Sequence, residues 1–165
     1  MIKVRPANIN DLPLIVAIYN SIIPDRNVTA DISPVTIDDK RDWFLSHTGN
    51  RPLWIIENMA DDIIGWASMR NFYGRPAYTG TAEFSVYLDE KFRGMGYGKA
   101  IIGYAIEQSP ALGISNLLAF VFEENSNSVA LFKKMGFETW ARLPEIAEYD
   151  DRKCSLLILG FKTSG

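Results

Sequence analysis

A glycine-rich segment of six residues constrains the fold of this chain more than any other feature. The segment, Arg93-Gly94-Met95-Gly96-Tyr97-Gly98, follows residues of alternating polarity and precedes residues with helical periodicity, so it is a strand-to-helix turn. Glycine lets the backbone adopt positive φ and approach a ligand closely. The following helix directs its unpaired N–H groups and the positive end of its dipole at the turn. Because Arg93 and Lys99 add positive charge at its two ends, the turn is suited to bind phosphate or pyrophosphate.

Two other phosphate-binding turns are excluded by single positions. A Walker loop requires glycine at position 93 and serine or threonine at position 100, where this chain has Arg93 and Ala100. A Rossmann turn requires glycine at position 99 and follows the first strand of its unit, whereas this turn has Lys99 and lies past the middle of the chain. A tight turn without a ligand remains the alternative, but three glycines beside an arginine favour a ligand.

The polarity pattern predicts helices and strands in the order β-α-α-β-β-β-α-β-α-β-β. Asn10 is expected to cap the first helix and Pro24 to end it, and Thr36 with Asp39 is expected to cap the second. We expect residues 1–165 to form one α/β (α+β) domain, a mixed, mostly antiparallel central sheet of about seven strands flanked by four helices. The strands are expected at residues 2–5, 53–57, 63–69, 81–88, 117–122, 137–142 and 155–161, and the helices at residues 11–23, 36–47, 98–109 and 126–134.

Charge and composition exclude several classes of protein. The chain has 17 Lys and Arg against 20 Asp and Glu, which argues against binding nucleic acid or an anionic membrane through bulk charge. The single Cys154 cannot form an intramolecular disulfide, and with the single His47 it provides too few ligands for a zinc site. We therefore expect a cytoplasmic protein without a metal ion, a membrane or a nucleic-acid partner. His47 is expected to be solvated and Cys154 to lie in the core.

Two motifs make the chain similar to the GNAT superfamily of acyl-CoA N-acyltransferases. The glycine-rich turn matches the Arg/Gln-x-x-Gly-x-Gly/Ala motif of that superfamily, and Asn125-x-x-Ser128-x-x-Leu131-Phe132-x-x-x-Gly136-Phe137 resembles its second motif. Residues 18–20, 74–78 and 81–87 resemble the phosphinothricin N-acetyltransferase branch. The resemblance covers nearly the whole chain. It implies the GNAT fold, acetyl-CoA as the acetyl donor, and direct attack of an amine within a ternary complex.

The resemblance also implies which residues bind acetyl-CoA. The backbone of the strand before the turn would pair with the pantetheine arm, and the turn itself would hold the pyrophosphate. Asn125 matches an asparagine that hydrogen-bonds the amide region of the donor, although asparagine is also a natural helix N-cap and both roles can hold at once. The complete implied set is Val86, Tyr87, Leu88, Arg93, Gly94, Met95, Gly96, Tyr97, Gly98, Lys99, Asn125 and Ser128.

Glu83 is the candidate catalytic base. The attacking amine must lose a proton before its lone pair can react, and the base has to receive that proton, here through a water molecule. Glu83 stands at the glutamate of the branch motif Thr-x-Glu-x-Ser-Val-Tyr, and strand alternation sets it opposite the apolar side chains. An exposed strand carboxylate is the alternative, and the motif match favours the base.

Five residues that precede Glu83 in the chain, together with Glu83 itself, are candidates for binding the acceptor. Arg75 and Tyr78 match branch positions that line the substrate pocket, and Phe72 and Tyr73 are weaker candidates, as is Asn20. Arg75 could hold a substrate carboxylate through two parallel hydrogen bonds. A solvated loop arginine is an equal alternative.

Two departures from the family pattern leave parts of the reaction open. Phe132 stands where many members have tyrosine and the branch often has histidine, and phenylalanine cannot protonate the departing thiolate. Water or another hydroxyl, with Tyr87 as one option, would have to do so, or CoA leaves as the anion. The usual C-terminal ending of the branch is replaced by Pro144-Glu145-Ile146-Ala147-Glu148, which puts a phosphinothricin-type acceptor in question.

The sequence thus predicts an N-acetyltransferase for a primary amine of a small molecule. An amino acid or analogue, such as phosphinothricin, methionine sulfoximine or methionine sulfone, is the expected acceptor by resemblance. A polyamine, an aminoglycoside or a protein N-terminus stays open as acceptor, and so does a module that binds acetyl-CoA without catalysis. The resemblance also admits a homodimer.

Overall fold

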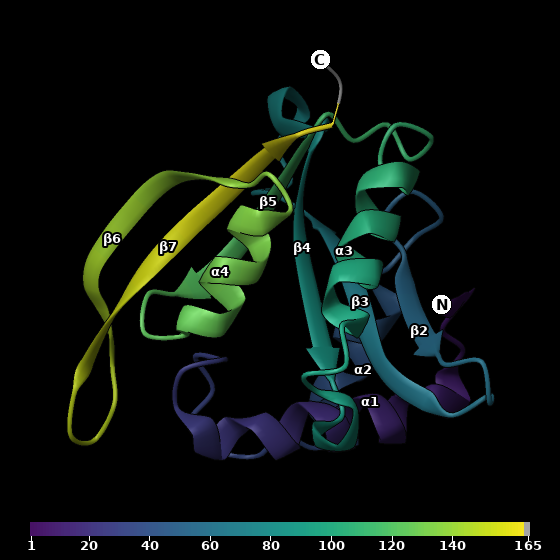
Figure 1. Ribbon diagram of the computed structural model, residues 1–165, viewed down its shortest axis with the longest axis horizontal. Helices are drawn as coiled ribbons and strands as arrows, with labels where there is room; N and C mark the ends of the chain where they lie inside the picture. The colour runs from purple at the N-terminus through teal and green to yellow at the C-terminus, as the bar shows by residue number, and fades with distance from the viewer. Residues whose placement is uncertain (164–165) are drawn as a thin grey trace.

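Seven strands pair into one sheet with helices on both faces in the computed structural model of the chain (Figure 1). The structure describes residues 1–163, and within them the strand order β1-β2-β3-β4-β5-β7-β6 confirms the expected mixed sheet flanked by four helices. None of the helices in this range is long and apolar enough to cross a bilayer. The strands are β1 (Lys3–Pro6), β2 (Leu53–Glu57), β3 (Ile63–Asn71), β4 (Thr81–Leu88), β5 (Asn116–Phe122), β6 (Glu138–Glu148) and β7 (Lys153–Lys162), and the helices are α1 (Leu12–Ile22), α2 (Ile37–Leu45), α3 (Tyr97–Gln108) and α4 (Ser126–Lys134).

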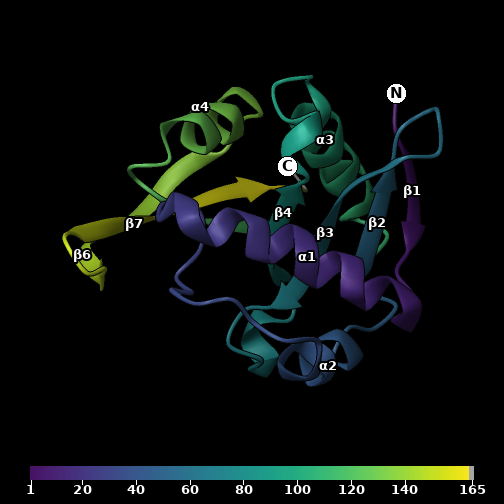
Figure 2. The ribbon, with the colours of Figure 1, turned by 90° about the horizontal axis from the view of Figure 1, so that it is seen from below.

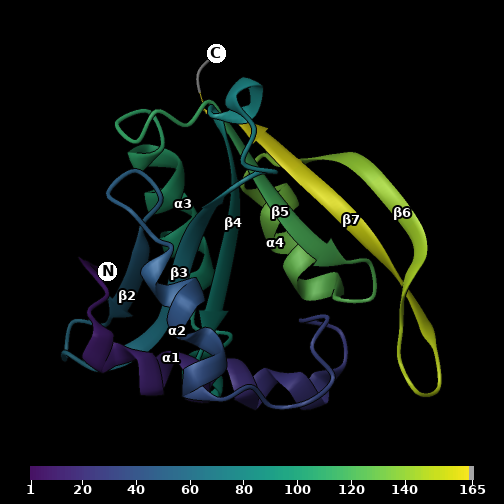
Figure 3. The ribbon, with the colours of Figure 1, turned by 180° about the vertical axis from the view of Figure 1, so that it is seen from behind.

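The pairing of β4 with β5 is the irregular feature of the sheet. Every other pair of neighbouring strands in residues 1–163 is antiparallel, whereas these two are parallel and their ladder joins only residues 81–83 to residues 116–118. Figures 1 and 3 show the two strands starting side by side and then separating. From Phe84 to Leu88, therefore, the edge of β4 that faces β5 has no strand partner in the described part of the chain. β4 and β5 therefore leave an opening within the sheet beyond these three pairs.

Two hydrophobic cores lie on the two faces of the sheet. Figure 2 shows α3 and α4 on one face and α1 with α2 on the other. On the first face Ile101 of α3 and Phe132 of α4 pack against the strands, and on the second Ile15 of α1 packs with Trp66 of β3. Burial of these apolar side chains, at about 1.5–3 kcal/mol each, fixes α1, α3 and α4 against the sheet.

β4 has the boundaries and the alternation that its sequence predicts. Ala82 and Phe84 are buried in the core under α3 and α4. Glu83, Ser85 and Tyr87 point to the other face, where they border a cavity beside α1 and α2. The strand thus presents its polar side chains to a space between the sheet and the first two helices.

The expected cap of the first helix is wrong. Asn8, not Asn10, is the capping residue: its side chain accepts a hydrogen bond from the N–H of Asn10, and it forms a reciprocal capping box with Asp11 around a short 3-10 turn. α1 follows this turn directly and ends at Ile22, so Pro24 lies in a second 3-10 turn rather than at the helix end.

The capping box at the second helix is confirmed. The Thr36 hydroxyl accepts a hydrogen bond from the Asp39 N–H, and the Asp39 carboxylate accepts one from the Thr36 N–H. Each box satisfies two backbone donors that the helix itself leaves unpaired.

The last two strands are longer than predicted. β6 runs for 11 residues and passes through Pro144, which the polarity pattern places beyond a strand end. Its register with β7 shifts between Leu143 and Ala147, so the proline lies in an irregular stretch of an edge strand, where no ladder bond to its nitrogen is required.

His47 is not solvated as expected, whereas Cys154 is in the core as expected. The ring of His47 is half-buried against Trp43, and its Nδ1 lies 2.9 Å from the Trp43 carbonyl oxygen. Desolvation lowers the pKa of this imidazole, which keeps the ring neutral near pH 7. Cys154 is fully buried beside Phe122 and Tyr149.

Candidate active site

The glycine-rich turn has the backbone that its residues predict. Gly94 and Gly96 have φ of 74° and 84°, and a Cβ built on either of them would meet no atom within 4 Å. Glycine is therefore required by the backbone conformation and not by packing. Gly96 is the N-cap of α3 and provides no side-chain cap, so the first N–H groups of the helix are open to a ligand.

Arg93 connects this turn to the strand before it. Its Nε donates to the carbonyl oxygen of Leu88 at 3.3 Å, and its Nη1 lies 3.4 Å from the carboxylate of Asp25. Met95 and Lys99 are exposed on the turn and the first turn of the helix. The candidate anion site thus lies at the end of β4, directly beyond the edge that β5 leaves open.

A narrow cavity of about 70 Å³ occupies the opening between β4 and β5. Residues 84–87 of β4 and 119–121 of β5 form its sides, and Val28, Asn125, Ser128, Leu131 and Phe132 complete it. Asn125 caps α4, because its side-chain oxygen accepts a hydrogen bond from the Ser128 N–H at 3.3 Å. A slot with a free strand edge on one side and an anion-binding turn at its end fits an extended thiol arm that carries a diphosphate.

Phe132 borders this opening and has the environment of a core residue. Its ring is 5% exposed and packs edge-on against Phe84 and Phe137. The structure therefore provides no proton donor at this position, as the sequence indicates.

A second cavity, of about 150 Å³, lies on the other side of β4 under α1 and α2. Four aromatic and three charged side chains are among the residues that border it. Residues of two helices face alternate residues of β3 and β4 across it. The lining residues are Ile15, Val16, Tyr19, Lys40, Trp43, Trp66, Ser68, Arg70, Glu83, Ser85 and Tyr87.

Within residues 1–163, Glu83 is the only carboxylate on the wall of this second cavity. It is half-buried, and burial raises the pKa of its carboxyl group above the ordinary value for glutamate, while the positive charge of Arg70 opposes that rise. Arg70 stands directly opposite Glu83 in the register of β3 and β4. A carboxylate whose pKa is raised toward neutrality is a better proton acceptor for an ammonium group than an exposed one.

Ser85 and Tyr87 border both cavities, so the two spaces adjoin at β4. Burial raises the pKa of Tyr87 to about 12, and the nearby charge of Glu83 contributes to this rise. The hydroxyl group therefore stays protonated at neutral pH and can donate a hydrogen bond.

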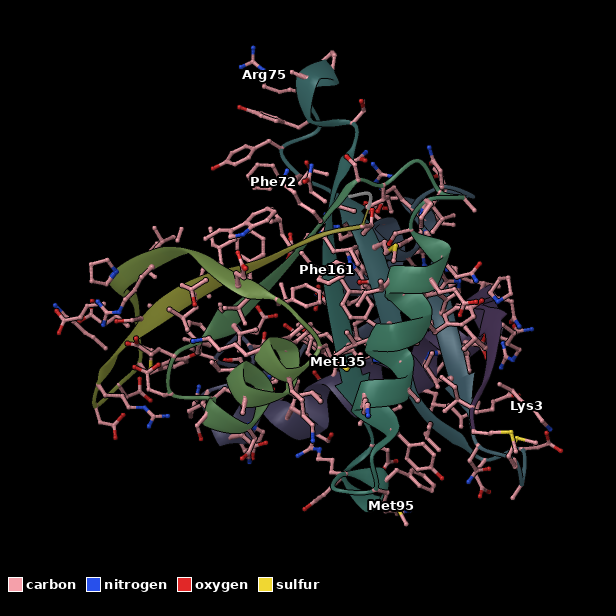
Figure 4. All side chains as sticks on the ribbon, turned by 45° about the horizontal axis from the view of Figure 1, so that its top comes forward. Lys3, Phe72, Arg75, Met95, Met135 and Phe161 are labelled. Carbon is pink, nitrogen blue, oxygen red and sulfur yellow. The ribbon has the colours of Figure 1, made fainter. Side chains whose placement is uncertain are left out.

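The structure does not bring the predicted acceptor-binding residues to Glu83. Phe72, Tyr73, Arg75 and Tyr78 lie on the loop between β3 and β4, and none of them lines either cavity. Their aromatic rings pack on one another, with Phe72 centred 4.7 Å from Tyr73 and 5.5 Å from Tyr78. Figure 4 shows Arg75 and Phe72 projecting beyond the sheet, at the opposite end of the molecule from Met95.

Asn20 is also outside the cavity. Its side chain donates to the carbonyl oxygen of Val35 and accepts from the N–H of the same residue, both at 2.9 Å. It therefore fastens the loop between α1 and α2.

Sequence reasoning missed the cationic residues of the cavity, Lys40 and Arg70, and its aromatic wall at Trp43. Arg70 could be found from the sequence, because Trp66, Ser68 and Arg70 are alternate residues of β3. They lie on the face of the sheet that carries Glu83. Lys40 and Trp43 are three residues apart on α2, which places them on one side of that helix.

Comparison with known proteins agrees with this geometry. Residues 15–137 match the model of the acetyltransferase (GNAT) family. YwnH of Bacillus subtilis, provisionally named a phosphinothricin acetyltransferase, is 47% identical over 160 residues, which cover 97% of this chain and 98% of that protein. An L-methionine sulfoximine/L-methionine sulfone acetyltransferase of Pseudomonas aeruginosa is 28% identical over 147 residues, which cover 88% and 86%.

Solved structures show the same relation. A crystal structure of a protein provisionally named a phosphinothricin N-acetyltransferase has a TM-score of 0.96 and 45% identity over all of both chains. A phosphinothricin acetyltransferase from Sinorhizobium meliloti, solved in complex with acetyl-CoA, has a TM-score of 0.90 and 26% identity over 98% of this chain and 88% of that one.

Proposed function

The chain belongs to the acetyltransferase (GNAT) family and is an acetyl-CoA-dependent N-acetyltransferase of small amines; we propose that its acceptor is an amino acid or an amino-acid analogue. The relatives named for phosphinothricin and for methionine sulfoximine support an acceptor of this class. The observation that carries the proposal is the meeting of two cavities at Ser85 and Tyr87, since a donor in one and an acceptor in the other would touch across β4.

On this proposal the donor lies in the opening between β4 and β5. The backbone of Val86, Tyr87 and Leu88 would hold its pantetheine arm, residues 93–99 its pyrophosphate, and Asn125 with Ser128 its amide region. Acetyl-CoA supplies a thioester whose carbonyl carbon accepts the amine. The free edge of β4 and the open N–H groups at the start of α3 support this placement.

Glu83 would act as the base on the acceptor side. A proton passes from the substrate ammonium, through one water molecule, to a carboxylate oxygen of Glu83, which leaves a lone pair on the amine. A strand N–H between Val86 and Leu88 would donate a hydrogen bond to the carbonyl oxygen that gains negative charge. As the C–N bond forms and the C–S bond breaks, Tyr87 would donate its Oη proton to the departing thiolate, in place of the donor that Phe132 cannot provide. The resulting phenolate would take up the proton that the nitrogen loses after the attack.

The test is release of free CoA thiol from acetyl-CoA across a panel of amino acids, polyamines and aminoglycosides. We expect turnover with amino acids, and we expect Glu83→Gln to lower kcat about 100-fold for the best of them. The matched control is Glu123→Gln, a carboxylate of the exposed turn before α4, which should leave kcat unchanged. A best acceptor without a carboxylate would contradict the proposed class, and no turnover of any amine would favour a module that only binds the donor.

We also infer that residues 1–165 form one domain that works in the cytoplasm, as a homodimer. One continuous sheet supports the single domain, and a free, buried Cys154 suits a reducing compartment. The exposed rings of Tyr73 and Tyr78 support a contact with a second copy. Light scattering on Tyr73→Ser tests the dimer, because a mass equal to that of the parent dimer would remove this loop as its contact.

A further inference from the structure

The second cavity, which is the proposed place of the acceptor and is called the acceptor cavity from here on, has two cationic side chains and one carboxylate in its lining. Of its lining side chains, Lys40 and Arg70 are cations and Glu83 is the one carboxylate. Neither cation takes part in an ion pair within residues 1–163. Glu83 therefore does not pair with both cations. A further carboxylate, that of Asp31, accepts a hydrogen bond from the Tyr19 hydroxyl group and forms no ion pair with either cation within residues 1–163, so these cations remain available to an anionic group of the acceptor.

Arg70 is fixed in its place by the sheet. Its partner in the ladder between β3 and β4 is Glu83, so the two side chains leave the same face on adjacent strands. Directly opposed residues have Cβ atoms about 5 Å apart. Arg70 is exposed at the mouth of the cavity, whereas Glu83 is half-buried within it.

Lys40 reaches the same cavity from the opposite wall. It comes from α2, and its Nζ lies 4.8 Å from the centre of the Tyr19 ring and 5.6 Å from that of Trp43. Such contacts hold an ammonium group near aromatic faces without neutralising it. The cavity thus has a charged group on each side and aromatic rings between them.

We propose that Arg70, assisted by Lys40, binds the carboxylate of the acceptor and so selects amines that carry one. This inference rests on the proposed function and names the residues that determine its specificity. An α-amino acid has its ammonium and carboxylate groups on one carbon atom, which suits a carboxylate and a guanidinium placed side by side on neighbouring strands. Arginine can engage a carboxylate through two parallel hydrogen bonds, and the aromatic rings then contact the rest of the acceptor. Arg75, on the projecting loop, has no part in this selection.

The experiment compares methionine sulfone with its carboxamide, which has the same amine but no negative charge. The quantity measured is the ratio of kcat/KM for the acid to kcat/KM for the amide. We expect Arg70→Met to lower this ratio about 10-fold to 100-fold through the acid alone, Arg70→Lys to restore part of it, and Lys40→Met to lower it less. The matched control is Arg41→Met, next to Lys40 on α2 but outside the cavity lining, which should leave the ratio unchanged.

Binding without the donor gives a second readout that does not depend on catalysis. Trp43 and Trp66 line the cavity, so tryptophan fluorescence can follow titration of the protein with methionine sulfone and with its carboxamide. Arg70→Met should weaken binding of the acid by the same factor and leave binding of the amide as in the parent.

Two outcomes would overturn the inference. One is an acid-to-amide ratio in Arg70→Met within twofold of the parent ratio, and the other is loss of the ratio in Arg75→Met instead. In both cases the parent still acetylates amino acids, so the proposed function stands. If the parent acetylates no amine, the proposed function fails, and the fluorescence titration then decides about Arg70 alone.

Discussion

Glu83 owes its expected reactivity to its position between two opposing influences. Burial beside α1 and α2 raises the pKa of its carboxyl group, the facing Arg70 lowers it, and the net shift is upward. The charged form is thus less favourable in the folded protein than in the unfolded chain. The raised pKa of Glu83 should therefore affect the pH dependence of both the rate and the stability of the enzyme.

The rate should rise with pH through the raised pKa of Glu83. The base works only when it is deprotonated, so kcat/KM should fall on the acid side at a pH above about 4.3, the pKa of glutamate in water. Measurement of kcat/KM between pH 4 and 8 for the parent and for Glu83→Gln checks this. The residual kcat/KM of the variant should show no fall on the acid side. An acid limb that persists in Glu83→Gln would assign it to another group.

The change of stability with pH that Glu83 causes should have the opposite sign to the change that an ion-paired carboxylate causes. Because the folded pKa of Glu83 is raised, its contribution to stability is fully present below the unfolded pKa and is lost as pH rises through the folded value. Glu83→Gln should therefore melt at a higher temperature than the parent at pH 7 and at the same temperature near pH 4. Calorimetry at the two pH values measures this, and a lower melting temperature at pH 7 would contradict burial as the dominant cause.

Tyr87 should matter for the departure of the thiol and not for folding. Tyr87→Phe keeps the ring that contacts Trp66 at 4.6 Å between centres and removes only the hydroxyl group. We expect kcat to fall about 10-fold with little change in the melting temperature. The kinetics should be compared with those of Ser85→Ala, which removes the hydroxyl group of the other residue that borders both cavities. A fall of kcat in the serine variant alone would transfer the role to Ser85.

At the scale of elements, the glycine turn and the two strands that separate beside it form the donor site. The turn needs positive φ at two positions, and β4 needs a neighbour that leaves its edge uncovered. Neither feature stabilises the fold by itself, since both leave backbone groups without protein partners.

Gly96→Ala should weaken donor binding much more than it weakens the fold. Alanine at φ of 84° costs about 1 kcal/mol of folding free energy. Distortion of the turn should raise the Kd of CoA at least 10-fold by calorimetric titration. Gly49→Ala is the control, since its added Cβ also meets nothing within 4 Å and its φ is not positive. Unchanged CoA affinity in Gly96→Ala would contradict a role of the turn in binding the donor.

The elements were predictable wherever local chemistry decides them. The limits of β4 and α4 follow from alternation and from helical periodicity, and the box at Thr36 follows from two side chains three residues apart. The end of β6 did not follow, because an edge strand tolerates Pro144 at a bulge and a single sequence does not reveal which strand is at the edge.

The candidate site was predictable in part for the same reason. Glu83 and the turn lie within continuous motifs, whereas the cavity around Glu83 forms only when α1 and α2 fold onto the sheet. Lys40 and Arg70 are 30 positions apart in the chain, and only packing brings them to one space. Arg75 shows the converse, since a motif near Glu83 in sequence lies on a loop that leads away from it.

At the scale of the whole molecule, the sheet has two parts, which three residue pairs of β4 and β5 connect. The opening between these two strands beyond the three pairs is the proposed place of the donor, and we call it the donor slot. β1 to β4 form one part and β5, β7 and β6 the other. A donor in the slot would contact both parts and bind the folded state alone. Its binding should therefore stabilise the whole molecule.

Saturation with acetyl-CoA should add about 2.7 kcal/mol to the unfolding free energy at a concentration 100 times its Kd. Hydrogen exchange should slow at the amides of residues 84–88 and 93–99, and less in β1 and β2. Denaturation in urea with and without acetyl-CoA measures the unfolding free energy, and dephospho-CoA serves as the ligand for comparison. Equal protection of β1 and of residues 84–88 would argue against the slot as the place of binding.

β4 also divides the chain into two halves with separate tasks. The acceptor cavity takes its residues from α1, α2, β3 and β4, while the donor slot takes all but Val28 from β4 and the segments after it. Exchange of the first 80 residues with those of a relative that acetylates a different amine should produce a chimera with the new acceptor and the old donor affinity. Diversification of this fold can thus proceed in one half while the other is held constant.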